Sequence, residues 1–242
     1  MNIHYYLIHG IDRERKPFME DQFRKFGIPA DDVTWITYPN KHDPLPDVCT
    51  KPTLPKGMIS CTYKHYLALK DICEKGHEHA VIMEDNIEFR DNVPNTLKAY
   101  MDELPDDWDC VFDTNFLGKK TIEPIVDGKF LYKHTYGLHH YVPYYSPDGL
   151  VHSQYEIYGA SKGAHFLFLT QLAARKLYAE FLPFHESSDH HYNILFDKLR
   201  LNVYWAEPPN VNKIYRPSTW LDNTSEVVHR HSSGVKLSWL KY

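Results

Sequence analysis

One apolar run in the sequence ends abruptly in three polar residues. Residues 80–83 are Ala, Val, Ile and Met, and Glu84, Asp85 and Asn86 follow directly. A short apolar run without polar alternation is typical of a strand that is covered on both faces. In open α/β sheets, ligands bind at the edge formed by the carboxyl ends of the strands. The sequence therefore predicts a buried strand in an α/β sheet, with three polar side chains at its ligand-binding edge.

Strand and helix patterns alternate around this run. The expected strands are 3–8, 33–38, 80–83, 108–113, 164–169 and, as the final strand, 203–206; the expected helices are 13–26, 59–75, 95–104, 170–181 and one that begins at Ser187 or Ser188. Gly27 and Gly76 stand where helix C-caps favour positive φ, and Thr170 is placed as an N-cap. Residues 39–55 read as a loop, and residues 129–158 read as a long functional loop or an irregular hairpin region.

Length and composition place the chain among ordinary globular proteins. Its 242 residues fit one domain, and 43% hydrophobic with 24% charged residues exclude a wholly disordered or fibrous chain. A formal net charge of -5 supplies no basic field for a nucleic-acid backbone, so no nucleic-acid partner is expected. The four cysteines lack C-x-x-C spacing and therefore read as reduced thiols, not as a zinc ribbon or a redox dithiol.

The apolar runs of the chain are short. None approaches the roughly 18 apolar residues of a membrane span, and the amino-terminal run is too short for a signal peptide. We therefore expect a cytoplasmic protein without a membrane span, either free or peripheral to a membrane.

Three segments carry a pattern in a fixed order. The first is Gly-Met-Ile-Ser-Cys-Thr-Tyr-Lys-His at 57–65, the second is 79–89 with the acidic triplet, and the third runs from Gly163-Ala-His165 through Ser188-Asp189-His190 to Val203-Tyr204 and Pro208-Pro209. In order and spacing, across about residues 3–211, the chain resembles glycosyltransferase family twenty-five. That family includes lipooligosaccharide galactosyltransferases and the collagen galactosyltransferase domain. Its Glu-Asp-Asp triplet is Glu84-Asp85-Asn86 here, so an amide replaces the last acid.

The resemblance implies a fold and an activity. The fold is the glycosyltransferase A fold, a Rossmann-like mixed α/β sheet flanked by helices. The activity is transfer of a hexose, with inversion at the anomeric carbon, from a nucleotide diphosphate sugar to a glycan or glycoprotein acceptor, with a uridine diphosphate sugar as the first candidate donor. We expect one catalytic domain over 1–242, with a nucleotide-sugar-binding half at 1–115 and an acceptor-binding half and tail at 116–242.

The acidic triplet is the expected metal site. Negative charge grows on the nucleoside diphosphate as it leaves, and a cation must meet that charge. Mn²⁺ or Mg²⁺ suits the oxygen ligands of Glu84, Asp85 and Asn86, although the neutral asparagine makes metal dependence an open question. A solvated strand end or a helix N-cap is the alternative interpretation of the triplet.

Further donor-binding residues are expected at the same edge. The full donor set is Ile8, His9, Gly10, Arg13, Glu84, Asp85 and Asp113. Arg13, Arg15 and Lys16 follow the first strand and could reach the phosphates, or could simply form an exposed helix start. His65, alone on an apolar helix face, reads as a packing or supporting residue and not as a catalyst.

An inverting transfer needs a base for the acceptor hydroxyl, and a carboxylate is the usual choice. Asp189 is the first candidate, with Glu186 and then Asp113 as substitutes. An aspartate in the first turn of a helix is, however, also stabilised by the helix dipole whatever the function.

The acceptor is expected beside a region rich in tyrosine and histidine, at 132–158, because sugar rings stack on such side chains. Tyr136, His165 and His190 are the expected acceptor-binding residues. Ordinary aromatic core is an alternative for this region. A histidine metal site at His134, His139 and His140 has no ligand spacing to support it. His229 and His231 could supply a late ligand, but alternate histidines on an exposed strand have the same pattern.

Two other function classes compete with this hypothesis. Asn86 motivates a degenerate relative that binds glycan or nucleotide without catalysis. A metal-dependent phosphoesterase or nucleotidyltransferase shares the acidic strand end but ranks last, because no Gly-rich phosphate loop is present.

Overall fold

The computed structural model describes residues 2–10, 14–51, 53–113, 122–124, 131–134, 140–145, 151–156, 163–206 and 210–213. The first half forms β1 (Ile3–Ile8), α1 (Arg15–Phe26), the 3-10 turn η1 (Ala30–Asp32), β2 (Val33–Ile36), α2 (Lys56–Lys75), β3 (His79–Glu84), β4 (Ile87–Phe89), α3 (Val93–Glu103) and β5 (Cys110–Phe112). The second half forms β6 (Ile122–Pro124), β7 (Leu131–His134), β8 (His140–Tyr145), β9 (Val151–Glu156), β10 (Phe166–Thr170), α4 (Gln171–Glu180), α5 (Ser188–Leu199), β11 (Val203–Ala206) and β12 (Val211–Lys213).

The main sheet is mixed. Its strand order is β2-β1-β3-β10-β5-β11-β7-β6. β1 pairs in parallel with β2 and β3, β5 pairs in parallel with β11, and β10 runs antiparallel between β3 and β5. The carboxyl ends of β1, β2, β3 and β5 therefore point to one edge of the sheet, where β10 begins. The predicted α/β fold with a Rossmann-like mixed sheet is confirmed.

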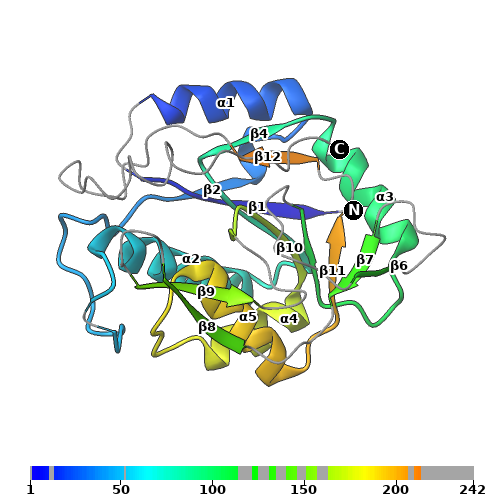
Figure 1. The fold of residues 1–242 in the computed structure, drawn as a ribbon. Helices are drawn as coiled ribbons and strands as arrows, with labels where there is room; N and C mark the ends of the chain where they lie inside the picture. Colours follow the sequence, from blue (N-terminus) through cyan, green and yellow to red (C-terminus); the bar gives the residue numbers. More distant parts are fainter. Residues whose placement is uncertain are drawn as a thin grey trace.

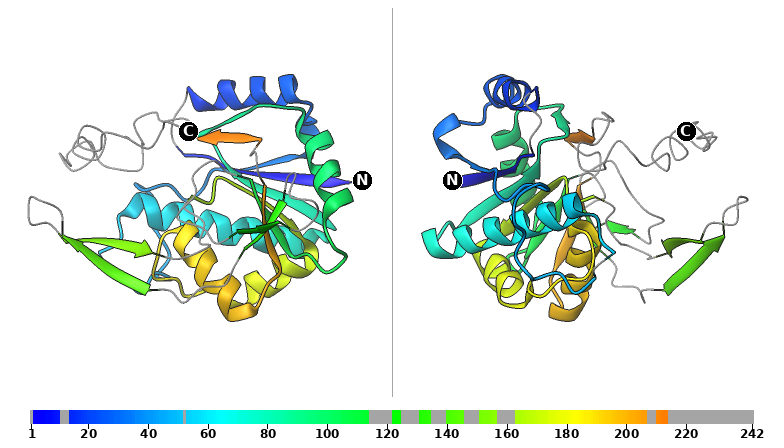
Figure 2. Two further views of the ribbon diagram at one scale, coloured as in Figure 1. Left: turned by 45° about the vertical axis from the view of Figure 1, so that its right-hand side comes forward. Right: turned by 90° about the vertical axis from the view of Figure 1, so that its left-hand side faces the viewer.

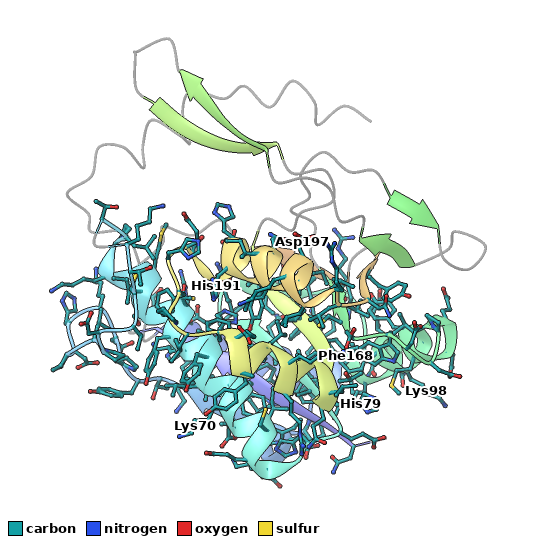
Figure 3. All side chains as sticks on the ribbon, turned by 90° about the horizontal axis from the view of Figure 1, so that it is seen from below. Lys70, His79, Lys98, Phe168, His191 and Asp197 are labelled. Carbon is teal, nitrogen blue, oxygen red and sulfur yellow. The ribbon has the colours of Figure 1, made fainter. Side chains whose placement is uncertain are left out.

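Helices cover both faces of this sheet (Figure 1). α1 and α3 lie on one face, which we call the α1 face, together with the small sheet that β4 forms with β12. α2, α4 and α5 pack side by side on the other face, the α2 face (Figure 3). Each face has its own hydrophobic cluster, so the sheet is buried on both sides.

The strand sequences match this double burial. In β3, Ala80 and Ile82 pack on the α2 face, whereas Val81 and Met83 pack on the α1 face. Successive strand side chains point to opposite faces, so a strand covered on both sides needs apolar residues at every position. The unbroken apolar run that the sequence shows is the direct result.

Three predicted helix caps are confirmed, whereas α1, α2 and α3 begin at Arg15, Lys56 and Val93 and not at the predicted 13, 59 and 95. Gly27 and Gly76 adopt φ of 80° and 74°, and their N–H groups donate to the carbonyls of Phe23 and Ile72. Thr170 caps α4, because its Oγ1 accepts a hydrogen bond of 3.1 Å from the N–H of Ala173. Glycine pays no Cβ penalty in the left-handed region, and a threonine cap satisfies a helix N–H that would otherwise lack a partner.

One feature of the chain differs from the prediction, and one of two predicted alternatives is found. The strand at 203–206 is not the last one, because β12 follows it and pairs antiparallel with β4. Both partners are three residues long, which is too short for a periodic sequence signal. Within 129–158, β8 and β9 form an antiparallel hairpin that stands off the main body (Figure 2), so the hairpin interpretation holds for that part.

None of the helices in the described part of the chain has the length and apolar character that crossing a membrane requires.

Candidate functional site

The sequence-predicted site residues gather where β1, β3 and β5 end and β10 begins. Three backbone hydrogen bonds join these ends: Asp85 N–H to Ile8 O at 3.2 Å, Glu84 N–H to His165 O at 3.0 Å, and Asp113 N–H to Phe166 O at 3.1 Å. The parallel direction of β1, β3 and β5 brings these segments to one edge, as the topology rule for α/β sheets requires.

Glu84 and Asp85 point to opposite faces of the sheet at this edge. Glu84 continues the Ala80 and Ile82 row and meets α2, whereas Asp85 continues the Val81 and Met83 row and meets α1. The alternation of strand side chains causes this separation. The two adjacent carboxylates therefore have separate partners.

Asp85 is the centre of a buried network on the α1 face. Its Oδ2 lies 2.7 Å from Nδ1 of His9 and accepts a 3.1 Å hydrogen bond from the N–H of Gly10. Its Oδ1 accepts a 2.7 Å charged hydrogen bond from Nη1 of Arg15. Burial alone would raise the pKa of Asp85, but the hydrogen bond from His9 and the charge of Arg15 outweigh it and hold this pKa below its usual value. Asp85 is thus an anion that positions one cation and the turn after β1.

Lys64 extends this network from α2. Its Nζ donates to the carbonyl of His9 at 2.7 Å and to Oδ1 of Asn40 at 2.9 Å. The side chain is almost fully buried, and burial lowers its pKa to about 8. Lys64 is not among the site residues predicted from the sequence. A lysine inside the apolar stripe of a predicted helix is a signal that could have identified it.

On the α2 face, Glu84 meets a thiol and an imidazole. Cys61 Sγ lies 3.7 Å from Oε1 of Glu84, and Nε2 of His65 lies 3.5 Å from the same oxygen. Nδ1 of His65 lies 3.3 Å from the hydroxyl of Tyr192 on α5. His65 is completely buried, in line with the expected packing role.

The expected Mn²⁺ or Mg²⁺ site does not fit this side-chain arrangement. Both oxygens of Asp85 already accept hydrogen bonds, and Glu84 lies on the other face beside sulfur and nitrogen. Oδ1 of Asn86 is buried and has no hydrogen-bond partner among the residues that the structure describes, so it could accept a further ligand, but it offers a single neutral oxygen. Hard cations prefer a convergent shell of oxygen ligands. The three residues of the triplet do not offer one here.

Asp113 lies at the same edge but has neutral partners. Its Oδ2 accepts a 2.9 Å hydrogen bond from Tyr100 of α3, and its Oδ1 accepts bonds of 2.7 Å and 3.2 Å from the N–H groups of Asn210 and Val211. Burial raises the pKa of Asp113 to about 6. In this arrangement Asp113 ties β12 and α3 to β5.

Asp189 lies at the amino end of α5. Its Oδ2 accepts a 2.9 Å hydrogen bond from the N–H of Gly163, and its Oδ1 accepts from Ser187 Oγ at 2.6 Å and from the N–H of His190 at 3.0 Å. Burial would raise the pKa of Asp189, but the charge of His190 and the hydrogen bonds from Ser187 and Gly163 outweigh it and lower this pKa. Asp189 is therefore an ionised carboxylate at neutral pH.

Gly163, whose N–H donates to Asp189, occupies a position where only glycine fits. Its φ is +96°, and a Cβ at this position would collide with the ring of His165. Only glycine combines this backbone conformation with the close approach of the ring. The hydrogen bond from Gly163 thus joins the entry to β10 with the start of α5.

Some of the remaining predicted residues are described by the structure, and others are not. Glu186 is paired with Lys51 at 2.7 Å, and Nδ1 of His190 lies 4.0 Å from the other oxygen of Glu186. His165 is buried beside Gly163. Arg13, Tyr136, His139, His229 and His231 lie outside the described residues.

Residues 4–191 match the family model for glycosyltransferase family 25, described as an LPS biosynthesis protein family. A curated rat protein, "Probable inactive glycosyltransferase 25 family member 3", is 31% identical over 75 residues, which cover 30% of this chain and 12% of the relative. The mouse counterpart, named as inactive, is 29% identical with the same coverage. The chain thus spans only a small part of these relatives. A solved glycosyltransferase involved in glycosylating the major capsid of PBCV-1 has a TM-score of 0.43 at 9% identity, covering 90% of this chain and 95% of its own, a likeness too weak to carry an argument.

Proposed function

The chain belongs to glycosyltransferase family 25, and we propose that it transfers a hexose from a nucleotide diphosphate sugar to a glycan or glycoprotein acceptor. A uridine diphosphate sugar is the proposed donor, and the transfer proceeds with inversion at the anomeric carbon. The observation that carries this proposal is the pair of buried cations, Arg15 and Lys64, around the Asp85 network at the ligand-binding edge of the sheet.

These cations suit a diphosphate. Arg15 and Lys64 each carry a positive charge beside the Asp85 carboxylate, and Asp43 is a further acid that acts on Lys64. Groups fixed before the reaction stabilise a leaving anion without the cost of reorganisation. Ile8, His9 and Gly10 shape the donor side of this edge, and Asp113 supports it from β5.

Arg15 and Lys64 are the proposed binding groups for the diphosphate. No step of the proposed transfer involves Mn²⁺ or Mg²⁺. Glu84, Asp85 and Asn86 have separate surroundings, which is why a shared ion among them is not part of the mechanism. Glu84 supports the edge from the α2 face.

Asp189 is the proposed base. As the acceptor oxygen forms its bond to the anomeric carbon, the bond from that carbon to the diphosphate oxygen breaks, and the acceptor proton passes to a carboxylate. The lowered pKa keeps Asp189 ionised and ready to accept a proton, while limiting its strength as a base. Glu186, close to His190 on the same helix start, is the substitute base.

The acceptor is proposed to bind between the start of α5 and the second half of the chain, within a single catalytic domain. Tyr136, His165 and His190 are its proposed contacts, and Arg13 is a further proposed contact of the donor. Aromatic and imidazole rings offer the flat surfaces and polar rims that sugar rings require.

Calorimetric titration of uridine diphosphate tests the donor site. We expect binding that persists in EDTA and that weakens about tenfold or more in Lys64→Met, because a charged hydrogen bond contributes roughly 1.5–3 kcal/mol. Lys70→Met is the matched control, since Lys70 lies on the same helix but is only half-buried and pairs weakly with Glu74 at 3.6 Å. Binding that requires Mn²⁺ would contradict the metal-free assignment, and no binding under either condition would contradict the proposed donor class.

A second candidate is a degenerate family member that binds nucleotide or glycan without catalysis. The names of the two curated relatives, both described as inactive, and the amide of Asn86 favour this alternative. Hydrolysis of a panel of nucleotide sugars separates the two candidates. Slow release of the nucleoside diphosphate identifies an enzyme, whereas nucleotide binding without release identifies a binding protein.

A further inference from the structure

Three side chains with metal-binding atoms meet on the α2 face, beside Lys64, which neighbours His65 on α2 and interacts electrostatically with Cys61. Sγ of Cys61, Nε2 of His65 and a carboxylate oxygen of Glu84 all lie within 4.8 Å of one another. All three residues are buried, with exposed fractions of 5%, 0% and 7%. The sequence spacing of Cys61 and His65 places them one turn apart on the same side of α2.

One atom of this cluster lacks a partner. Nε2 of His65 is fully buried and makes no hydrogen bond within the described part of the chain, although it lies 3.5 Å from Oε1 of Glu84. A buried imidazole nitrogen without a hydrogen bond is costly unless a further ligand satisfies it. The nitrogen lies within 4.8 Å of the carboxylate and the thiol, two groups that can also bind a metal.

The distances suit a small tetrahedral ion. Metal bonds of about 2.3 Å to sulfur and about 2.0 Å to nitrogen or oxygen place ligand atoms roughly 3.3–3.5 Å apart. The sulfur–oxygen distance is 3.7 Å and the nitrogen–oxygen distance is 3.5 Å. Adjustments of a few tenths of an ångström along these two edges would close the shell, and a water would occupy the fourth position.

The other nitrogen of His65 already has the partner that a metal-bound histidine needs. Nδ1 of His65 lies 3.3 Å from the hydroxyl of Tyr192, which is completely buried on α5. When Nε2 binds a metal, Nδ1 carries the hydrogen and donates it to a second group that fixes the ring. Tyr192 is placed to accept that hydrogen.

We propose that Cys61, His65 and Glu84 bind one Zn²⁺ ion in a site that joins the end of β3 to α2. Sulfur, nitrogen and oxygen together favour Zn²⁺ over the harder Mg²⁺ and Mn²⁺. A thiolate and a carboxylate balance the two charges of the ion, so the buried site is neutral overall. The ion holds Glu84 on the α2 face, and Asp85 keeps its own partners on the α1 face.

Metal analysis of the whole chain, produced without a metal-affinity tag, is the first test. After incubation with Zn²⁺ and dialysis against zinc-free buffer, we expect close to one zinc per chain, and we expect chelation to lower the melting temperature. Replacement by Co²⁺ should produce the near-ultraviolet charge-transfer absorption of a thiolate ligand. Absence of retained zinc and of this absorption would overturn the proposal.

Variants locate the ion. Cys61→Ser should abolish the Co²⁺–thiolate absorption, whereas Cys73→Ser, on the same helix but outside the cluster, should leave it unchanged. Tyr192→Phe should keep the absorption but weaken Zn²⁺ binding by about 10–100-fold, as loss of a supporting hydrogen bond does. An absorption that survives in Cys61→Ser would place the ion elsewhere and contradict the assignment.

One measurement remains informative if Cys61→Ser does not fold. In a Cys49→Ser/Cys73→Ser variant both half-buried cysteines are absent and Cys61 is intact, so the Co²⁺–thiolate absorption must persist. Its disappearance would contradict the site. These readouts are independent of nucleotide binding and of sugar transfer, so failure of this site and failure of the proposed function are separate outcomes.

Discussion

Asp85 lies on the α1 face between a histidine, a backbone N–H and an arginine, whereas Glu84 lies on the α2 face beside a thiol and an imidazole. The two residues are neighbours in the chain, and the pleat of β3 gives them different chemistry. Asp85 forms a charged network that suits a phosphate-binding edge. Glu84 joins a cluster that suits a borderline-soft cation. Adjacent acids at a strand end therefore have different hydrogen-bond partners here, and we expect their substitution to have different effects.

The largest expected effect is at Asp85. Asp85→Asn removes a charged partner of the buried Arg15, and breaking a buried ion pair costs about 3–5 kcal/mol of unfolding free energy. Urea denaturation at neutral pH measures this loss. The control is Asp21→Asn on the same helix as Arg15, which breaks an exposed pair with Arg24 and should cost less than about 1 kcal/mol. Equal losses in the two variants would show that the Asp85 network is not a buried ion pair.

The free energy of unfolding should depend on pH in opposite directions through Asp85 and Asp113. Both side chains lie on the α1 face but have different hydrogen-bond partners. The pKa of Asp85 is lowered, so its stabilising contribution is present above the unfolded value of 3.8 and is lost as the pH falls through its folded pKa. The pKa of Asp113 is raised to about 6, so its contribution is present below 3.8 and is lost as the pH rises through about 6.

Asp113→Asn should therefore remove a pH-dependent change of about 3 kcal/mol in unfolding free energy between pH 4 and 7, since one pKa unit corresponds to about 1.4 kcal/mol. Chemical denaturation at several pH values measures this change. The asparagine keeps an oxygen for the N–H groups of Asn210 and Val211, so the fold should persist. An unchanged pH profile in this variant would contradict the burial of Asp113 as the source of its raised pKa.

Glu84→Gln should have a smaller effect than Asp85→Asn when a chelator is present. Without an ion, the glutamine weakens the contacts with Cys61 and His65, and we expect a cost of about 1 kcal/mol. When Zn²⁺ is present, the cost should increase, because the variant lacks one proposed ligand. Thermal unfolding in both conditions measures the difference, and a cost independent of Zn²⁺ would argue against separate roles for the two carboxylates.

The smallest effect is expected at Glu20. Glu20→Gln removes an exposed pair with Lys16 on α1, at 3.8 Å, and should change the unfolding free energy by less than about 0.5 kcal/mol. The same denaturation assay checks it. A loss similar to that of Asp85→Asn would mean that total charge on α1, and not burial, accounts for the Asp85 effect.

Local signals in the sequence predicted much of the fold. Gly27, Gly76 and Thr170 end or begin helices through their own conformations and side chains, so their positions are readable directly. The apolar run at 80–83 predicted the buried strand and the edge at which Asp85 lies. Successive side chains of a strand point to opposite faces, so the same run also implied that Glu84 and Asp85 lie on different faces. The prediction of a shared metal site did not take this into account.

The remaining features depend on contacts between distant segments. β12 meets β4 across more than a hundred residues, and no local pattern marks either strand. Arg15 reaches Asp85, and Lys64 reaches the carbonyl of His9, only because β1, β3 and α2 pack together. The position of Lys64 in an apolar helix stripe can indicate that the lysine is buried, but its partner becomes visible only in the fold.

A crystal structure of the chain with uridine diphosphate tests the donor site most directly. The proposed function predicts the diphosphate at the carboxyl edge of β1 and β3, within hydrogen-bond distance of Arg15 and Lys64, with no ion shared by Glu84 and Asp85. A diphosphate bound through a cation between those two carboxylates, or bound away from both Arg15 and Lys64, would contradict it.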